Sequence, residues 1–152
     1  MPKVYLTTNQ LQTKKLGEKF AKKILKTKPR EKSFVLGLEG DLGGGKTTFL
    51  QGFAKGLGIK EKILSSTFLI MRKFEIRNSK FENFIHIDCY RIKKPKEILA
   101  LGFKEIISNP QNIVAVEWAG RIKKILPKNS LILKFQFLNK NSRKIWLKRK
   151  SD

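Results

Sequence analysis

The segment from Gly40 to Thr47 constrains the fold of this chain more than any other part of its sequence. It reads Gly-Asp-Leu-Gly-Gly-Gly-Lys-Thr and satisfies the pattern G-x-x-x-x-G-K-[ST], the signature of a phosphate-binding loop. The run 34–38 before it is nearly all apolar, which is typical of a strand buried on both faces. The segment 46–57 after it is expected to be a helix, with Gly58 in place to end it. This strand–loop–helix context is what the motif requires before it indicates a phosphate site.

Each residue type in the loop has a physical role. Glycines let the backbone curl so that successive N–H groups point at phosphate oxygens, and the helix that begins at the loop adds the positive end of its dipole. Lys46 is expected to reach the β- and γ-phosphates, and the hydroxyl of Thr47 to ligate Mg²⁺. The expected nucleotide-binding residues are Asp41, Leu42, Gly43, Gly44, Gly45, Lys46, Thr47 and Thr48. A glycine-rich turn that only caps a helix is the alternative, and the order of strand, loop, Lys-Thr and helix argues against it.

Two further segments that read as core strands end in an acid, as the metal side of such a site requires. Residues 113–116 are apolar and lead into Glu117, and the run Ile-His-Ile at 85–87 leads into Asp88. The chain has only 12 acidic residues, so two at expected strand ends are informative. We expect Asp88 and Glu117 to act with Lys46 as catalytic residues, and Glu117 to join Thr47 on the metal. The alternative for either acid is a place in a solvated loop.

The remaining reactive side chains favour ordinary structural roles. His86 is the only histidine, and one imidazole cannot form a metal cluster, so a hydrogen-bonded structural histidine is the preferred interpretation. Cys89 is the only cysteine, which excludes an internal disulfide and fits a small core residue in a reducing cytosol. Arg91 and Arg121 follow the two acidic strand ends. Both are placed to touch phosphate, and surface or ion-pair roles are the alternative.

Strand and helix patterns alternate along the chain. Expected strands span 4–7, 34–38, 67–76, 84–88, 113–117, 131–138 and 143–148, and expected helices span about 10–27, 46–57, 95–101, 103–107 and 119–126. Asn9, with Gln12 three residues later, marks the start of the first helix. We therefore predict an α/β fold with three layers, like that of P-loop NTPases: parallel core strands and an antiparallel C-terminal hairpin at the edge. Residues 1–152 are expected to form one domain.

The charge is extreme and says less about partners than its size suggests. Of 152 residues, 34 are Lys or Arg and 12 are Asp or Glu, so the net charge is +22 and the sequence pI is about 10.3. Such a surface suits phosphate-bearing partners. However, 27 of the 34 are Lys, a residue that AT-rich codons encode, so base composition of the genome is an alternative source of the excess. A solvated Lys-rich surface is therefore the preferred interpretation of the charge. Trp146 lies within the basic tail 143–150, a pattern that nucleic-acid binders use. The same residues fit an exposed hairpin edge whose lysines prevent aggregation, which is the preferred interpretation.

No apolar run approaches the ~18 residues of a membrane span, and the start of the chain has no signal-like apolar stretch. A soluble, cytoplasmic protein is therefore expected.

The ordered set of motifs resembles the TsaE (YjeE) family of small bacterial P-loop ATPases. Beyond the loop, the resemblance rests on Phe-Ala-Lys-Gly-Leu-Gly-Ile at 53–59, Ser-Ser-Thr-Phe at 65–68, His-Ile-Asp-Cys-Tyr-Arg at 86–91, Pro95 to Gly102, and Val-Glu-Trp-Ala at 116–119. It covers roughly residues 9 to 147. The loop alone is shared by a vast superfamily, and the ordered set is much more specific.

The resemblance implies a cytosolic ATPase that binds ATP or ADP with Mg²⁺. Such a protein is needed for the threonylcarbamoyl modification of adenosine 37 in tRNAs that read codons starting with A. The family works with two partner proteins, TsaB and TsaD, and TsaD carries the transfer chemistry. Contact with tRNA is then expected to be indirect, through the complex, and the isolated protein is expected to be a monomer.

Residue roles are carried over by position. The resemblance implies that Lys46 and Thr47 bind phosphate and Mg²⁺ and that Glu117 takes the Walker B role beside the metal. It also implies that Asp88 is a second acid required for activity, and that Thr67 lies in a switch-like loop near the γ-phosphate.

Three positions depart from the family pattern. Ser66 stands where the family usually has proline, so the loop that carries Thr67 is less stiffened here. Gly44 replaces a common alanine, which is conservative for a phosphate cradle. Gly120 stands where glutamate is usual, so a role of that acid is absent or supplied elsewhere. Trp118 is expected to adjoin the site and to report nucleotide binding by its fluorescence.

Three functions stay in competition at this point. A partner-dependent ATPase is expected to turn over slowly alone, because no residue is an obvious arginine finger. A small-molecule or nucleotide kinase shares the size and the loop, but such kinases generally carry an Arg-rich lid and this chain has only 7 Arg. An RNA-binding module with a structural nucleotide is the third.

Overall fold

The computed structural model describes residues 3–40, 45–63 and 69–150. Within these ranges the strands are β1 (Lys3–Thr7), β2 (Phe34–Gly40), β3 (Met71–Glu75), β4 (Asn83–Asp88), β5 (Asn112–Glu117), β6 (Leu131–Phe137) and β7 (Arg143–Arg149). The helices are α1 (Gln10–Leu25), α2 (Lys46–Gly56), α3 (Pro95–Leu99), α4 (Phe103–Ser108) and the 3₁₀ segment η1 (Ala119–Ile125). No helix in this part of the chain is long and apolar enough to cross a membrane.

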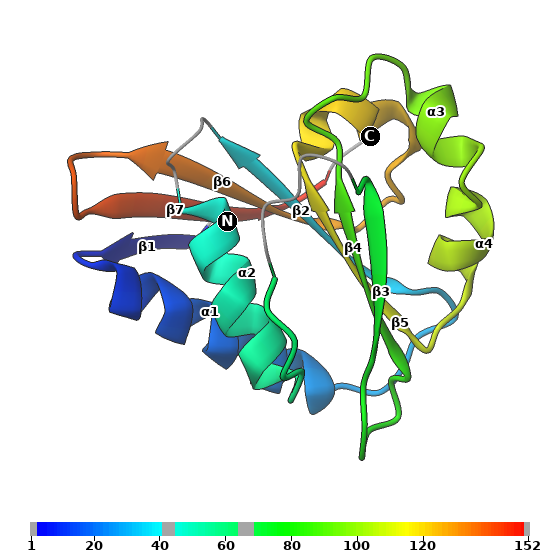
Figure 1. The fold of residues 1–152 in the computed structure, drawn as a ribbon, viewed down its shortest axis with the longest axis horizontal. Coiled ribbons are helices and arrows are strands. Elements are labelled where there is room, and N and C mark those ends of the chain that lie inside the picture. The colour runs from blue at the N-terminus through cyan, green and yellow to red at the C-terminus, as the bar shows by residue number, and fades with distance from the viewer. Residues whose placement is uncertain (1–2, 41–44, 64–68, 151–152) are drawn as a thin grey trace.

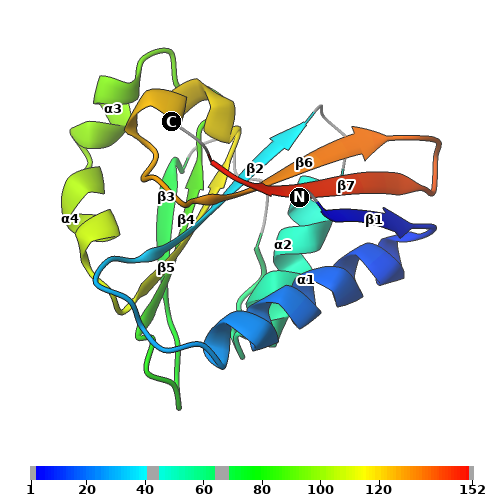
Figure 2. The same cartoon turned by 180° about the vertical axis from the view of Figure 1, so that it is seen from behind.

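The strands form one sheet in the order β1-β7-β6-β2-β5-β4-β3. The central strands β6, β2, β5 and β4 run parallel, and β3, β7 and β1 each add an antiparallel pairing. Helices α1 and α2 cover one face, while α3, α4 and η1 lie on the other (Figure 1 and, from behind, Figure 2). The predicted three-layer fold with parallel core strands and an antiparallel C-terminal hairpin is confirmed.

The position of the C-terminal hairpin differs from the prediction. The hairpin of β6 and β7 does not form the edge of the sheet, because β1 pairs antiparallel with β7 along Lys3–Thr7. The short apolar pattern of β1 predicts a strand but carries no information on its partner. The edge is therefore formed by the N-terminal strand, and the two ends of the described chain are joined in one ladder.

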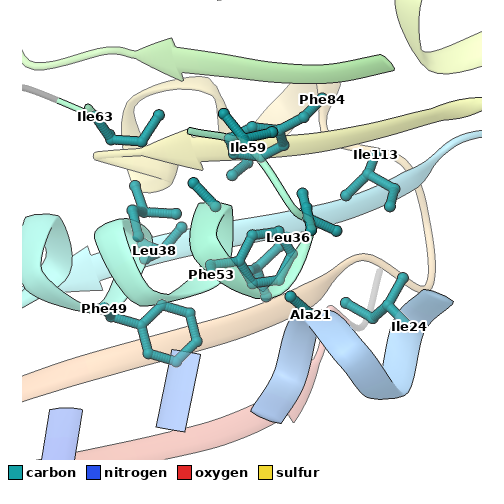
Figure 3. Close-up of a cluster of buried hydrophobic side chains, with 14 of the residues drawn as sticks. Ala21, Ile24, Leu36, Leu38, Phe49, Phe53, Ile59, Ile63, Phe84 and Ile113 are labelled. Carbon is teal, nitrogen blue, oxygen red and sulfur yellow. The ribbon is translucent and has the colours of Figure 1, made fainter. Parts of the chain in front are cut away.

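The core beneath α2 fixes the direction of that helix. Phe49 and Phe53 on α2 are fully buried and lie between the helix and the inward side chains Leu36 and Leu38 of β2 (Figure 3). The ring of Phe53 also contacts that of Phe84 on β4, with centroids 5.6 Å apart. Burial of each such side chain contributes about 1.5–3 kcal/mol. The first turn of α2 is thereby held above the carboxyl ends of the parallel strands.

Helices α1 and α2 approach so closely that their backbones touch at glycines. A Cβ atom on Gly52 of α2 would lie 1.8 Å from the carbonyl oxygen of Lys14, and one on Gly17 of α1 would lie 2.1 Å from that of Phe49. No side chain fits at such distances, so the helices can pack in this way only with glycine at both positions.

We expect Gly52→Ala to lower the free energy of unfolding by about 2 kcal/mol or more. Overpacking typically costs about 1–3 kcal/mol and here meets backbone, while the higher helix propensity of alanine returns only about 1 kcal/mol. Urea denaturation measures the change. Gly120→Ala is the matched control, because its Cβ would meet only a carboxylate oxygen of Glu39 at 3.5 Å. Equal stability of Gly52→Ala and wild type would contradict the prediction, because it would mean that α1 and α2 can move apart without a cost in free energy.

Most expected boundaries agree with the structure to within two residues. The side chain of Asn9 accepts a hydrogen bond from the backbone N–H of Gln12 at 2.8 Å, as the start signal predicts. Gly58 and Gly102 both have positive φ, at 81° and 86°. The first follows the C-terminus of α2, and the second separates α3 from α4. These local signals are reliable because left-handed backbone favours glycine.

Two elements differ from the expectation. The strand predicted over 67–76 is observed only as Met71–Glu75. Its partner β4 ends at Asp88, one residue beyond the Ile87 that pairs with Met71, so the pairing cannot extend more than one residue further toward the N-terminus of β3. Residues 67–68 lie outside the described ranges. The helix predicted over 119–126 is a 3₁₀ segment with a non-helical residue, Ile122, inside it. Short 3₁₀ turns commonly serve as such connectors.

Candidate nucleotide-binding site

The start of α2 carries the described part of the phosphate-binding motif. Asp41, Leu42, Gly43 and Gly44 lie outside the described residues, as do Ser66 and Thr67. Gly45 has a left-handed backbone with φ of 97°, which suits glycine, and its carbonyl accepts the N–H of Phe49 at 2.9 Å. The N-terminal end of α2 is thus placed where its dipole favours an anion.

Lys46 is a buried cation at this helix start. Its side chain is only 5% exposed, and its ammonium group donates a hydrogen bond to the backbone carbonyl of Gly40. The nitrogen also lies 4.2 Å from the centroid of the Trp118 ring, a distance at which a cation is attracted to the ring face. These contacts offset part of the cost of burying the charge. They hold the ammonium at the carboxyl end of β2.

The two acids expected at strand ends lie side by side. Asp88 and Glu117 are direct partners in the parallel pairing of β4 with β5, and the N–H of Cys89 extends the ladder to the carbonyl of Glu117 at 3.0 Å. Thr47 also faces this pair, because its hydroxyl lies 3.5 Å from Oε1 of Glu117. Four residues that the sequence singled out, Lys46, Thr47, Asp88 and Glu117, therefore converge on one end of the sheet.

The carboxylate of Glu117 is buried and held from two sides. The residue is 4% exposed; its Oε1 faces Thr47, and its Oε2 lies 2.8 Å from Nε2 of His86. His86 is also buried. The interpretation of His86 as a hydrogen-bonded histidine is confirmed, but its partner is a residue of the candidate site and not part of the general scaffold.

Asp88 is half-buried beside Glu117. Burial raises the pKa of the Asp88 carboxyl above its ordinary value, and the nearby charge of Glu117 raises it further. The backbone N–H of Tyr90, which donates to Oδ1 at 3.0 Å, opposes the shift, as do His86 and Lys46 more weakly. A carboxylate with a raised pKa accepts a proton more readily than one in water.

We expect Asp88→Asn to stabilise the fold at neutral pH. The native carboxyl binds a proton more tightly than the unfolded one, so wild-type stability falls as pH rises from the ordinary pKa of 3.8 through the raised native value. Asparagine keeps the acceptor for Tyr90 and carries no charge. Thermal melts from pH 3 to pH 8 should show an advantage of the variant that is present at neutral pH and disappears in acid. An advantage that is constant across this range would contradict the assignment to the buried charge.

The residues present fit Mg²⁺ held jointly with a nucleotide. Among the described residues, no group of three or more His, Cys, Asp or Glu side chains could hold a metal ion on its own. Mg²⁺ is usually bound by one or two carboxylates together with substrate phosphates and water, all oxygen ligands. The hydroxyl of Thr47 and Oε1 of Glu117, which lie 3.5 Å apart, would supply such ligands from two elements that face each other.

An aromatic group borders the site. Trp118 has a left-handed backbone with φ of 57°, and its ring lies 5.1 Å from that of Tyr90. The guanidinium of Arg121 lies 5.5 Å from the Trp118 ring centroid, and one of its nitrogens donates to the carbonyl of Ile92 at 3.4 Å. Arg91 and Arg121 are both exposed, and Arg121 lies against the aromatic rings that border the site; contact of either with phosphate stays a prediction.

Cys89 is fully buried among apolar side chains. Burial raises the pKa of its thiol to about 12, and the neighbouring charge of Asp88 adds to the shift. The side chain is therefore a neutral thiol at physiological pH, and its interpretation as a small core residue is confirmed.

Arg143 is a residue of this region that the sequence pattern grouped with the basic tail. It begins β7, and its side chain lies against Gly45: a Cβ atom there would be 3.5 Å from Cγ of Arg143. One guanidinium nitrogen donates to the carbonyl of Asn139 at 2.8 Å, whereas Nε is buried without a hydrogen-bond partner in the part of the chain that the structure describes. Only the sheet order, which no local motif encodes, brings this arginine to the start of α2.

Gly120 lies beside another acid. A Cβ atom on Gly120 would be 3.5 Å from a carboxylate oxygen of Glu39, the residue before Gly40 on β2. A carboxylate is therefore present next to position 120 although the chain has glycine there.

Comparisons with known proteins agree on one family. The family model described as "Threonylcarbamoyl adenosine biosynthesis protein TsaE" matches residues 7–145. The tRNA threonylcarbamoyladenosine biosynthesis protein TsaE of Rickettsia prowazekii is 36% identical over 141 residues, which are 92% of this chain and 90% of that protein. The protein of the same name from Bacillus subtilis is 43% identical over 97 residues, 64% of this chain and 58% of that one.

A solved structure has the same fold. The crystal structure of Bacillus subtilis YdiB superposes with a TM-score of 0.76 and 31% sequence identity, and the match covers 97% of this chain and 84% of that one. The similarity thus extends over the whole sheet and both helical layers.

Proposed function

The chain belongs to the TsaE family, and on this basis we propose that it is an ATP-binding and ATP-hydrolysing protein of tRNA threonylcarbamoyladenosine biosynthesis. The observation that carries the proposal is the convergence of Lys46, Thr47, Asp88 and Glu117 at one end of the sheet, in a chain whose family match spans residues 7–145. We propose that residues 1–152 act as one domain, a monomer in isolation, in the cytoplasm that the resemblance implies.

The chemistry proposed is attack of water on the γ-phosphorus of ATP, which breaks the bond to the bridging oxygen and releases ADP and phosphate. Lys46 and the N–H groups at the start of α2 bind the phosphates and stabilise the charge that develops during transfer. Thr47 and Glu117 would hold Mg²⁺, which supplies further charge neutralisation when it is bound. Asp88, with its raised pKa, is the residue best suited to accept a proton from the attacking water. Binding and positioning do most of the work in such reactions.

Partners complete the proposed activity. No arginine stands out in the sequence as a finger for the γ-phosphate, and Arg143 lies against Gly45 at the start of α2. We therefore propose slow hydrolysis by the isolated protein and faster turnover with TsaB and TsaD. Contact with tRNA is proposed to be indirect, through that complex. The family match favours this function over a small-molecule kinase or an RNA-binding module.

Reconstitution with TsaB, TsaD and tRNA tests the proposal. Incorporation of labelled threonine into tRNA, followed over several turnovers, is expected with wild type and with Lys55→Ala, an exposed change on α2. It is expected to stop after about one turnover with Lys46→Ala, Asp88→Ala or Glu117→Ala. Multiple turnovers with all three variants would refute the site.

Two further results would favour the alternatives. Vigorous hydrolysis by the lone protein, unchanged by TsaB and TsaD, with phosphate transferred to a nucleoside, would support a kinase. Tight, steeply salt-dependent tRNA binding that Lys46→Ala retains would support an RNA-binding module.

A further inference from the structure

His86 is a buried polar residue in a position where the sheet otherwise presents apolar side chains. Residues 84, 86 and 88 of β4 share one face of the sheet with 113, 115 and 117 of β5, because the pairing joins Phe84 to Ile113, His86 to Ala115 and Asp88 to Glu117. The neighbours Phe84, Ile113 and Ala115 are fully buried and apolar. An imidazole that is 6% exposed in such surroundings is costly unless it has a partner.

The partner of His86 is the diagonal neighbour on β5. The pairing sets His86 directly opposite Ala115, a small residue, and two residue pairs before Glu117, on the same face of the sheet. The imidazole can therefore reach past Ala115 to the carboxylate, and Nε2 lies 2.8 Å from Oε2 of Glu117. An ionised carboxylate only accepts hydrogen bonds, so Nε2 carries the hydrogen and donates it. The other oxygen, Oε1, is left to face Thr47 at 3.5 Å.

We propose that His86 is a positioning residue for the metal side of the nucleotide site. It fixes the carboxylate of Glu117 so that Oε1 faces Thr47 and is presented, together with the Thr47 hydroxyl, to the Mg²⁺ of a bound Mg–nucleotide, an assignment that rests on the proposed function. Partners of this kind orient ligands that would otherwise rotate, and their loss typically weakens metal binding or activity about 10–100-fold. Without the donor, Oε2 would be a buried, unsatisfied acceptor, and the carboxylate would turn to satisfy it.

Calorimetric titration with ADP, with and without Mg²⁺, tests the assignment separately from catalysis. His86→Leu fills much of the ring volume and removes the donor, whereas His86→Gln restores an N–H at similar reach. Ile85→Val, at a buried position of the same strand that faces the opposite layer, is the control for lost packing. We expect His86→Leu to raise the Mg²⁺ concentration for half-maximal enhancement of ADP binding about 10-fold, with Mg²⁺-free affinity within about 2-fold of wild type. His86→Gln should recover most of the loss.

The outcomes separate this assignment from the function on which it rests. The same Mg²⁺ half-saturation in His86→Leu and wild type would overturn the positioning role, as would a loss that affects Mg²⁺-free binding equally. If His86→Leu does not fold, the test rests on His86→Gln. Loss of the Mg²⁺ enhancement in His86→Gln, as complete as the loss expected for Glu117→Gln, would also overturn the role. Wild-type protein that binds ADP without any effect of Mg²⁺ would instead contradict the proposed function itself.

Discussion

Lys46→Ala is expected to weaken ATP and ADP binding by about 10²–10³-fold, both with and without Mg²⁺. Lys46 is only 5% exposed at the start of α2, and its ammonium has the carbonyl of Gly40 and the ring of Trp118 as neighbours, so a phosphate bound there meets a positive charge that water screens little. Loss of one such preorganised group typically costs about 10²–10³-fold. Calorimetry with each nucleotide measures the effect, and support of tRNA modification should disappear in parallel.

The matched control for Lys46→Ala lies on the same helix. Lys55 is exposed near the C-terminal end of α2, so Lys55→Ala removes one of the 34 basic residues without touching the site. If both variants lose the same small amount of affinity, the general positive charge of the protein attracts the nucleotide and the site assignment is wrong. Thermal melts of both variants exclude unfolding as the cause of lost binding.

Glu117→Gln is expected to separate nucleotide binding from its dependence on Mg²⁺. Glutamine keeps the shape and an oxygen that can accept from His86, but it has no charge to offer a metal. Affinity for ADP without Mg²⁺ should stay within about 2-fold of wild type, whereas the gain on adding Mg²⁺ should be lost and single-turnover hydrolysis should fall by about 10²–10³-fold. The contrast with Lys46→Ala, which weakens binding under both conditions, identifies the metal side of the site.

A second substitution, Glu39→Gln, serves as the control for Glu117→Gln. Glu39 also lies at the end of β2, beside Gly120, and is an acid of the same type. Glu39→Gln should retain the full Mg²⁺ enhancement if Glu117 is the metal-side acid. Retained enhancement in Glu117→Gln with its loss in Glu39→Gln would move that role from β5 to β2.

The parts of the site that the sequence predicts are those encoded within single segments. Lys46 and Thr47 belong to one motif, and Asp88 and Glu117 each end a segment with a strand pattern. Parallel strands end at the same side of a sheet, so these segments alone indicate that the acids lie near the loop. The order of strands and helices likewise follows from local periodicity and from glycines such as Gly58 and Gly102.

What the sequence does not predict depends on pairing register and on sheet order. His86 reaches Glu117 only because β4 and β5 align Asp88 with Glu117, and a shift of one residue would turn His86 to the other face. Arg143 reaches Gly45 only because β7 lies beside β6, and β6 beside β2. Glycines in helices usually appear unfavourable, so the close contact at Gly52 has no local signal either.

The sheet order also determines when the molecule can assemble during its synthesis. Of the seven described strands β1 is made before the others, yet the partner that the described residues give it is β7, which is made after the other six. Strand β2, which leads into the phosphate-binding motif, likewise gains its second parallel neighbour only when β6 is complete. The nascent chain therefore carries two open strand edges until the hairpin arrives and inserts between them. Such edges invite misassembly, and repulsion between chains with a net charge of +22 opposes it.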